Sequence, residues 1–107
     1  MNQGDVYWYT FRAPDKRRPV LIVTRQSALR YLSSVTVVPI TSTLRGIPTE
    51  VRLTPDDGLL QECAVNCDNL QTVTKAQLGL FITHLSAEKL QLVRAAMAFA
   101  LGLDDLE

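Results

Sequence analysis

The sequence is poor in the residues that build metal centres and crosslinked scaffolds. Its 107 residues include two cysteines and one histidine. Cys63 and Cys67 lie four positions apart, which on a strand separates their Cα atoms by roughly 13 Å, too far for a disulfide. A zinc site needs more ligands than these cysteines and His84 supply. We therefore expect both cysteines and His84 to be structural, and we expect no metal and no cofactor.

Long apolar runs are also missing, and the net charge is zero. No window of about 18 residues is continuously apolar, as a membrane-spanning helix requires. The N-terminus lacks the basic-then-apolar order of a signal peptide. These features predict a soluble, cytoplasmic protein without membrane contact. The hydrophobic content of 47% suits one domain, residues 1–107, with its own core.

The neutral total conceals an uneven distribution of charge. Residues 1–53 carry eight Lys/Arg and three Asp/Glu, a net charge of +5, and residues 54–107 carry three and eight, a net charge of −5. The densest cluster is Lys16-Arg17-Arg18, directly before Pro19 and an apolar run. Either the two halves intermix and the field averages out, or one face of the molecule is basic.

Short runs of β-branched and aromatic residues predict a mainly β fold. The expected strand segments are 4–11, 19–24, 34–40, 49–53, 63–69, 70–73 and 78–84, with turns at 13–17 and 55–58 and one or two helical turns within 26–32. Pro39 cannot donate a ladder hydrogen bond, so its strand is expected to be an edge strand, to be bulged or to end there.

The hydrophobic period changes after Ser86, a natural N-cap residue. Four apolar residues then recur at helical spacing: Leu90, Val93, Met97 and Leu101. They predict a helix over about 87–101, ended by Gly102. Many short strands followed by one helix suggest a small, partly open barrel or a pair of curled sheets over about 3–84, with the helix packed across it.

Three polar stretches are candidates for a functional site. Arg18 precedes a proline, which favours an extended backbone, and its guanidinium matches phosphate geometry. Thr41 and its hydroxyl neighbours end an apolar strand, and Asp68 lies where two apolar runs meet. Each stretch also has a plain structural interpretation: a solvated loop that protects an edge strand, ordinary turn formers, and an Asx-turn residue.

Taken in order, several stretches resemble the MazF/PemK family of toxin endoribonucleases from bacterial toxin–antitoxin pairs. They are "GDVYW" at 4–8, "KRRPVLIVT" at 16–24, "VTVVPITST" at 35–43, "TEVRL" at 49–53, "VNCDNLQTV" at 65–73 and "ITHLS" at 82–86. The resemblance implies an SH3-like β-barrel with a C-terminal helix, assembled as a homodimer. It also implies sequence-specific, metal-independent cleavage of single-stranded RNA and neutralisation by a cognate antitoxin.

The same resemblance assigns roles to individual residues. Arg18 and Thr41 match the family's main catalytic positions, and Asp68 matches an acidic residue that some members use. Nearby polar residues become candidates for RNA binding, namely Lys16, Arg17, Ser42, Thr43, Arg45, Asn66 and Asn69. The chain departs from the family in its short "RAPDK" loop and in Asn66, where one branch has an arginine.

The residue types suit RNA cleavage by the substrate's own 2′-hydroxyl. This reaction needs a base, positive charge on the developing phosphorane and an acid for the leaving oxygen, and it gives 2′,3′-cyclic phosphate and 5′-hydroxyl ends. Two alternatives remain open. One is a CcdB-like gyrase poison, although this chain lacks that family's Trp-Gly-Ile ending. The other is a non-catalytic SH3-like module that binds peptides or nucleic acid.

Overall fold

The computed structural model describes residues 1–12 and 16–105, so the turn predicted around Pro14 and Asp15 lies outside the described residues. The strands are β1 (Asp5–Phe11), β2 (Lys16–Ile22), β3 (Ser34–Thr41), β4 (Glu50–Leu53), β5 (Cys63–Asn66), β6 (Gln71–Thr74) and β7 (Phe81–His84). The helical segments are α1 (Ala87–Ala100) and the short 3-10 turns η1 (Gln26–Ala28), η2 (Pro55–Asp57), η3 (Cys67–Asn69), η4 (Lys75–Gln77) and η5 (Leu103–Asp105). No helix of this part of the chain is long and apolar enough to cross a membrane.

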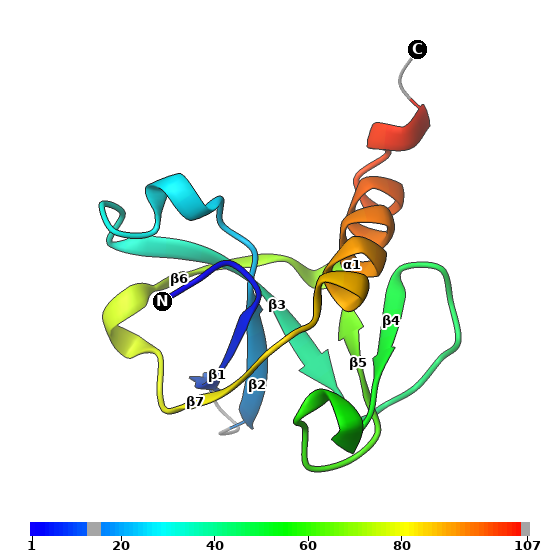
Figure 1. Cartoon of the computed structure of the whole chain (residues 1–107), viewed down its shortest axis with the longest axis horizontal. Helices are drawn as coiled ribbons and strands as arrows, with labels where there is room; N and C mark the ends of the chain where they lie inside the picture. Colours follow the sequence, from blue (N-terminus) through cyan, green and yellow to red (C-terminus); the bar gives the residue numbers. More distant parts are fainter. Residues whose placement is uncertain (13–15, 106–107) are drawn as a thin grey trace.

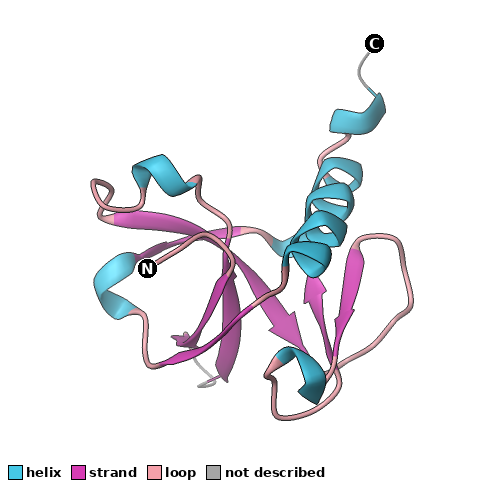
Figure 2. Cartoon of the chain, viewed as in Figure 1, coloured by secondary structure: helices cyan, strands magenta, loops and turns pink. Residues whose placement is uncertain are grey.

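The strands form one curled antiparallel sheet (Figures 1 and 2). Its strand order is β4-β5-β3-β2-β1-β7, and β6 pairs with the first half of β3. Helix α1 packs against β4 and η3 beside the curled end of the sheet (Figure 1). The predicted fold, mainly β with a C-terminal helix in a partly open SH3-like barrel, is confirmed.

The sheet buries apolar side chains on both faces, because β2 and β3 are apolar at consecutive positions. Leu21 belongs to a core shared with α1, whereas its neighbours Val20 and Ile22 belong to a second core under η1 and β6. All three side chains are fully buried. Successive strand residues point to opposite faces, so a continuous apolar run is what a strand between two cores requires.

Pro39 lies inside a central strand, so the expectation of an edge strand is wrong. The Thr36 carbonyl accepts from the Val23 N–H, which directs the backbone groups of even-numbered β3 residues toward β2. The nitrogen of Pro39 therefore faces the other side of β3. On that side, the residues of β3 up to Val37 pair with β6, and the residues from Ile40 onward pair with β5. The missing donor falls in this gap and leaves no ladder bond unmade.

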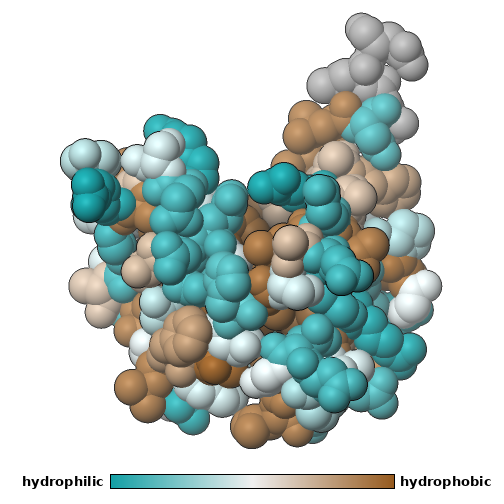
Figure 3. All heavy atoms as spheres, viewed as in Figure 1, coloured by the Kyte–Doolittle hydropathy of each residue, from teal (hydrophilic) through white to brown (hydrophobic). Residues whose placement is uncertain are grey.

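Helix α1 begins where the sequence predicts and ends one residue earlier. The Ser86 hydroxyl accepts from the Lys89 N–H at 3.2 Å and caps the first turn. Gly102 follows the helix with a φ of 71°, the left-handed conformation expected of a C-terminal glycine. The predicted apolar stripe is wrong at Leu101, which is 55% exposed, while Ala96 is buried instead. Leu92 and Phe99 also project from the helix, which carries apolar surface in Figure 3.

Candidate functional site

The three cations at 16–18 belong to β2 itself, which begins three residues earlier than predicted. They therefore alternate between the faces of the sheet. Arg18 pairs with Tyr9 and Arg17 pairs with Thr10, so the two arginines point in opposite directions. The guanidinium carbon of Arg17 lies 4.2 Å from the ring centroid of Trp8, a cation–π contact. The basic cluster of the sequence is thus divided into two groups with different surroundings.

Arg18 and Thr41 come from neighbouring strands and lie close to one another. The register of β2 with β3 pairs Val20 with Pro39, and continuing it by two residues places Arg18 opposite Thr41. Directly opposite residues of an antiparallel pair share a face of the sheet. Arg18 is half-buried, and because it lies inside a strand, its Cα and Cβ atoms are held in place by the backbone of the sheet. The structure therefore brings together the two residues that the resemblance implies are catalytic.

The hydroxyl groups after β3 are arranged by a local hydrogen bond. The Thr43 N–H donates to Thr41 Oγ1 at 3.1 Å. A hydroxyl oxygen that accepts one bond can still donate its own hydrogen, so Thr41 can offer an O–H to an anion. Ser42 lines the same cavity that Arg18 borders. Thr43 and Arg45 are exposed farther along this loop, where the Arg45 N–H donates to Glu50 Oε1 at 3.0 Å.

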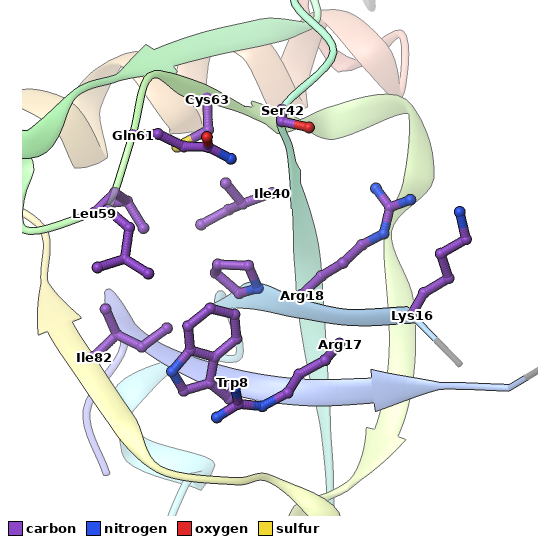
Figure 4. Close-up of a pocket in the computed structure, with 12 residues that line it drawn as sticks. Trp8, Lys16, Arg17, Arg18, Ile40, Ser42, Leu59, Gln61, Cys63 and Ile82 are labelled. Carbon is purple, nitrogen blue, oxygen red and sulfur yellow. The ribbon is translucent and has the colours of Figure 1, made fainter. Parts of the chain in front are cut away.

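A cavity of about 290 Å³ opens beside these residues (Figure 4). Its walls are largely apolar, with polar and cationic groups at the rim. The lining residues are Trp8, Lys16, Arg17, Arg18, Pro19, Ile40, Ser42, Leu59, Leu60, Gln61, Cys63 and Ile82. In Figure 4, Arg17 lies alongside Trp8, whereas Arg18 extends away from Trp8 toward the Ser42 end of β3. None of the described residues that line the cavity is acidic.

Asp68 does not join Arg18 and Thr41 within the chain. Thr41 pairs with Ala64, and two strand residues and part of η3 separate Ala64 from Asp68, a span of roughly 10 Å. Asp68 Oδ2 accepts from the hydroxyl of buried Thr49 at 2.6 Å. Its N–H donates to Asn66 Oδ1, the Asx-turn arrangement of the structural interpretation. Asp68 and Asn69 are exposed at this end of the sheet, apart from the cavity.

The two cysteines are free and buried, as predicted. Burial raises the pKa of both thiols, and the negative charges of Asp57 and Asp68 add to the shift for Cys63 and Cys67 respectively. The pKa of Cys67 rises to about 11. Both thiols therefore stay protonated at neutral pH, which argues against a nucleophilic role.

His84 forms a pair at the other end of β1. Its Nδ1 lies 2.8 Å from Oδ1 of Asp5, whose side chain is 6% exposed. Asp5 and His84 are cross-strand partners in the pairing of β1 with β7. Among the described residues, no group of three or more His, Cys, Asp or Glu side chains is placed to hold a metal ion.

Sequence reasoning missed the apolar half of the site. Trp8 belongs to β1 and Ile82 to β7, and only the folded sheet brings these two strands to the cavity. Gln61 lies in a loop whose sequence has no motif that indicates a binding role. The aromatic run at 7–9 predicted a strand, but only the pairing of Trp8 with Pro19 shows which aromatic ring faces the basic stretch.

Comparisons with known proteins agree on one family. Residues 2–101 match the family described as the PemK-like, MazF-like toxin of type II toxin–antitoxin systems. The Mycobacterium tuberculosis protein named Endoribonuclease MazF3 is 44% identical over 90 residues, which cover 84% of this chain and 87% of that protein. Endoribonuclease MazF4 of the same species is 36% identical over 86 residues, 80% of each chain.

Solved structures show the same relationship. Mycobacterium tuberculosis toxin MazF-mt6 superimposes with a TM-score of 0.85 at 38% identity, covering 96% of this chain and 98% of that one. A mycobacterial endoribonuclease in complex with its cognate antitoxin also gives 0.85, at 33% identity and 96% coverage of both chains. A MazE–MazF complex from Deinococcus radiodurans, at 22% identity and a TM-score of 0.81, shares the fold. The chain therefore belongs to the PemK-like, MazF-like toxin family of type II toxin–antitoxin systems.

Proposed function

We propose that this chain, an endoribonuclease of the family, cleaves single-stranded RNA at short sequence motifs and does so without a metal ion. The observation that carries the proposal is the placement of Arg18 opposite Thr41 at the end of two paired strands, beside a cavity rimmed by cations. Both side chains start from strands, so they can present donors to a phosphate with little reorganisation.

In the proposed reaction, the 2′-oxygen of one nucleotide attacks the adjacent phosphorus and the bond from phosphorus to the 5′-oxygen breaks. The 2′-hydroxyl proton passes to a general base, and a general acid gives a proton to the leaving 5′-oxygen. Arg18 neutralises the charge that develops on the phosphorane, and the Thr41 hydroxyl donates to one of its oxygens. The products are a 2′,3′-cyclic phosphate and a 5′-hydroxyl.

For the base in this scheme, Asp68 is the acidic residue that the resemblance implies, and that role stays a prediction. Its bond to Thr49 and its distance from Thr41 favour a contact with a flanking part of the RNA. An Asp68→Asn variant distinguishes the two roles, because loss of a general base lowers the rate by about 10²–10⁴, whereas a flanking contact gives a much smaller loss.

The proposal is tested with a long RNA in EDTA. We expect discrete fragments that carry cyclic phosphate and 5′-hydroxyl ends, and we expect an RNA with a 2′-deoxy sugar at the cut site to resist. Cleavage of the deoxy substrate at the normal rate would rule out attack by the 2′-oxygen. Intact RNA under all conditions would leave the alternatives, a non-catalytic binding module or a poison that acts on a protein.

We also propose that the chain acts as a homodimer that a cognate antitoxin neutralises. Support for a dimer comes from apolar side chains on α1, such as Leu92 and Phe99, which border a groove against β4. Support for an antitoxin comes from the mycobacterial relative whose structure includes its cognate antitoxin. The basic rim around Arg18 is a surface that an acidic, disordered segment can cover.

A further inference from the structure

We propose that the cavity beside Arg18 is a binding pocket for one nucleobase of the RNA, and that Gln61 helps to select that base. The inference rests on the proposed function, because it uses Arg18 as the phosphate-binding residue. It assigns a role to a cavity whose walls include residues that the reaction itself does not use. Trp8, Leu59, Gln61 and Ile82 line this cavity at the end of the sheet (Figure 4).

The walls suit the flat, apolar faces of a base. Trp8, Pro19, Ile40, Leu59 and Ile82 surround the space, and at about 290 Å³ it lies near the lower end of volumes for small-molecule sites. Sequence-specific proteins read single-stranded RNA by stacking splayed bases on aromatic rings or on guanidinium planes. The Arg17 guanidinium, 4.2 Å from the Trp8 ring centroid, offers both surfaces at the mouth of this space.

Charge at the rim favours a nucleotide over a neutral ligand. Lys16, Arg17 and Arg18 all border the cavity, and none of the described lining residues is acidic. Arg18 also belongs to the proposed phosphate site. When Arg18 holds a phosphate of the RNA, the base of an adjoining nucleotide therefore lies within reach of the cavity. A neutral small molecule would have no need of the cations at the rim.

Gln61 and Ser42 are the uncharged polar side chains of the rim. A glutamine amide has both a donor and an acceptor, so it can pair with the edge of one base and leave another base with unmatched groups. Its neighbours Leu59 and Leu60 also line the cavity, and the buried side chain of Leu59 anchors this loop to the core. We therefore assign Gln61 as a specificity-determining residue, separate from Arg18 and Thr41.

The first test uses the wild-type protein and needs no catalysis. Trp8 is the only tryptophan of the chain, so its fluorescence reports on the cavity. The probes are non-cleavable RNAs with a 2′-deoxy sugar at the mapped cut site and one abasic nucleotide placed in turn at each of the two positions on either side. We expect one abasic position to abolish the change in Trp8 emission and to weaken binding about 5- to 100-fold, the range for loss of one stacked base.

The second test compares Gln61→Leu with Gln91→Leu, the same change at an exposed position of α1. We expect Gln61→Leu to relax the base preference by about tenfold at the position that the abasic scan identifies, and Gln91→Leu to leave it unchanged. The base preference is read from cleavage ends mapped on mixed RNA.

The proposal fails if no abasic position alters Trp8 emission or affinity while the unmodified RNA binds. It also fails if Trp8 responds to an acidic antitoxin peptide and not to RNA, which would make the cavity a protein-binding site. Either result leaves cleavage of unmodified RNA untouched, so failure of the pocket is distinguishable from failure of the proposed function. Absence of both RNA binding and cleavage would overturn both.

Discussion

Cys67 shows how one buried side chain links the stability of this protein to pH. The thiol is 1% exposed, and its pKa is raised to about 11 by burial and, to a lesser extent, by the charge of Asp68. A thiol with a raised pKa favours the folded state fully below its unfolded pKa of about 9. This stabilisation is lost as the pH rises from about 9 to about 11.

We therefore expect alkaline pH to destabilise the wild-type protein more than a Cys67→Ala variant. The free energy of unfolding, measured with urea at pH 8, 9.5 and 11, should fall by about 2–3 kcal/mol more for the wild type across this range. Other titrating groups affect both proteins alike, so the difference isolates the thiol. Parallel curves for the two proteins would contradict the assigned pKa.

At the scale of elements, the loop after η2 connects the fold to the cavity. Gly58 has a φ of +96°, and a Cβ at this position would lie 2.7 Å from the Cβ of Thr83 and closer still to its hydroxyl. The next residues, Leu59–Gln61, line the cavity. The glycine thus lets the loop turn tightly against β7, and any larger residue must displace either the loop or the Thr83 side chain.

A Gly58→Ala substitution is expected to reduce stability by about 1–3 kcal/mol, through backbone strain and the contact with Thr83. Gly46 supplies the control, because it also has a positive φ but a Cβ there would meet no atom within 4 Å. Urea unfolding of Gly58→Ala and Gly46→Ala separates the cost of backbone strain, which both variants share, from the cost of crowding Thr83, which only Gly58→Ala has. Equal losses would show that the crowding at Thr83 contributes nothing.

The elements also show what the sequence predicts well and where it fails. Period and turn residues are local signals, so they predicted the terminal helix, its Ser86 cap and the existence of each strand. The start of β2 was missed because charged residues normally mark loops, whereas here Lys16 and Arg17 pair with β1. Pro39 was misjudged because its place between β5 and β6 depends on pairing with distant segments.

The candidate site divides in the same way. Local sequence made Arg18 and Thr41 candidates, the resemblance implied their catalytic roles, and their juxtaposition follows from strand register. The separation of Arg17 from Arg18 and the cavity walls follow from the three-dimensional pairing of strands far apart in sequence. No local pattern carries that information.

Over the whole molecule, two surfaces suit two kinds of partner. The basic rim of the cavity suits RNA or an acidic antitoxin segment, and the apolar face of α1 suits a second copy of the chain. We expect a mass twice that of the 11.9 kDa chain by light scattering at micromolar concentration. A monomer that retains full activity would contradict the proposed homodimer. Dimerisation through the apolar face of α1 would leave the basic rim available for RNA and for an antitoxin.

The antitoxin is expected to compete with RNA. A short acidic-amphipathic fragment from the end of the cognate antitoxin should weaken binding of a non-cleavable RNA in a titration, because both ligands need the cations around Arg18. The competition should weaken as salt is raised. Simultaneous binding of fragment and RNA with undiminished affinities would show that inhibition acts from another surface.

Arg18 and Thr41 are proposed to hold the phosphate at which RNA is cut. The most direct measurement is the single-turnover rate of cleavage in EDTA by Arg18→Ala, with Thr41→Ala for comparison and Arg94→Ala, an exposed arginine of α1, as the control. Removal of a donor to a developing anion is expected to lower the rate about 10²–10³-fold for Arg18→Ala, with a smaller loss for Thr41→Ala and none for Arg94→Ala. A folded Arg18→Ala protein that cleaves RNA at a near wild-type rate would contradict the account.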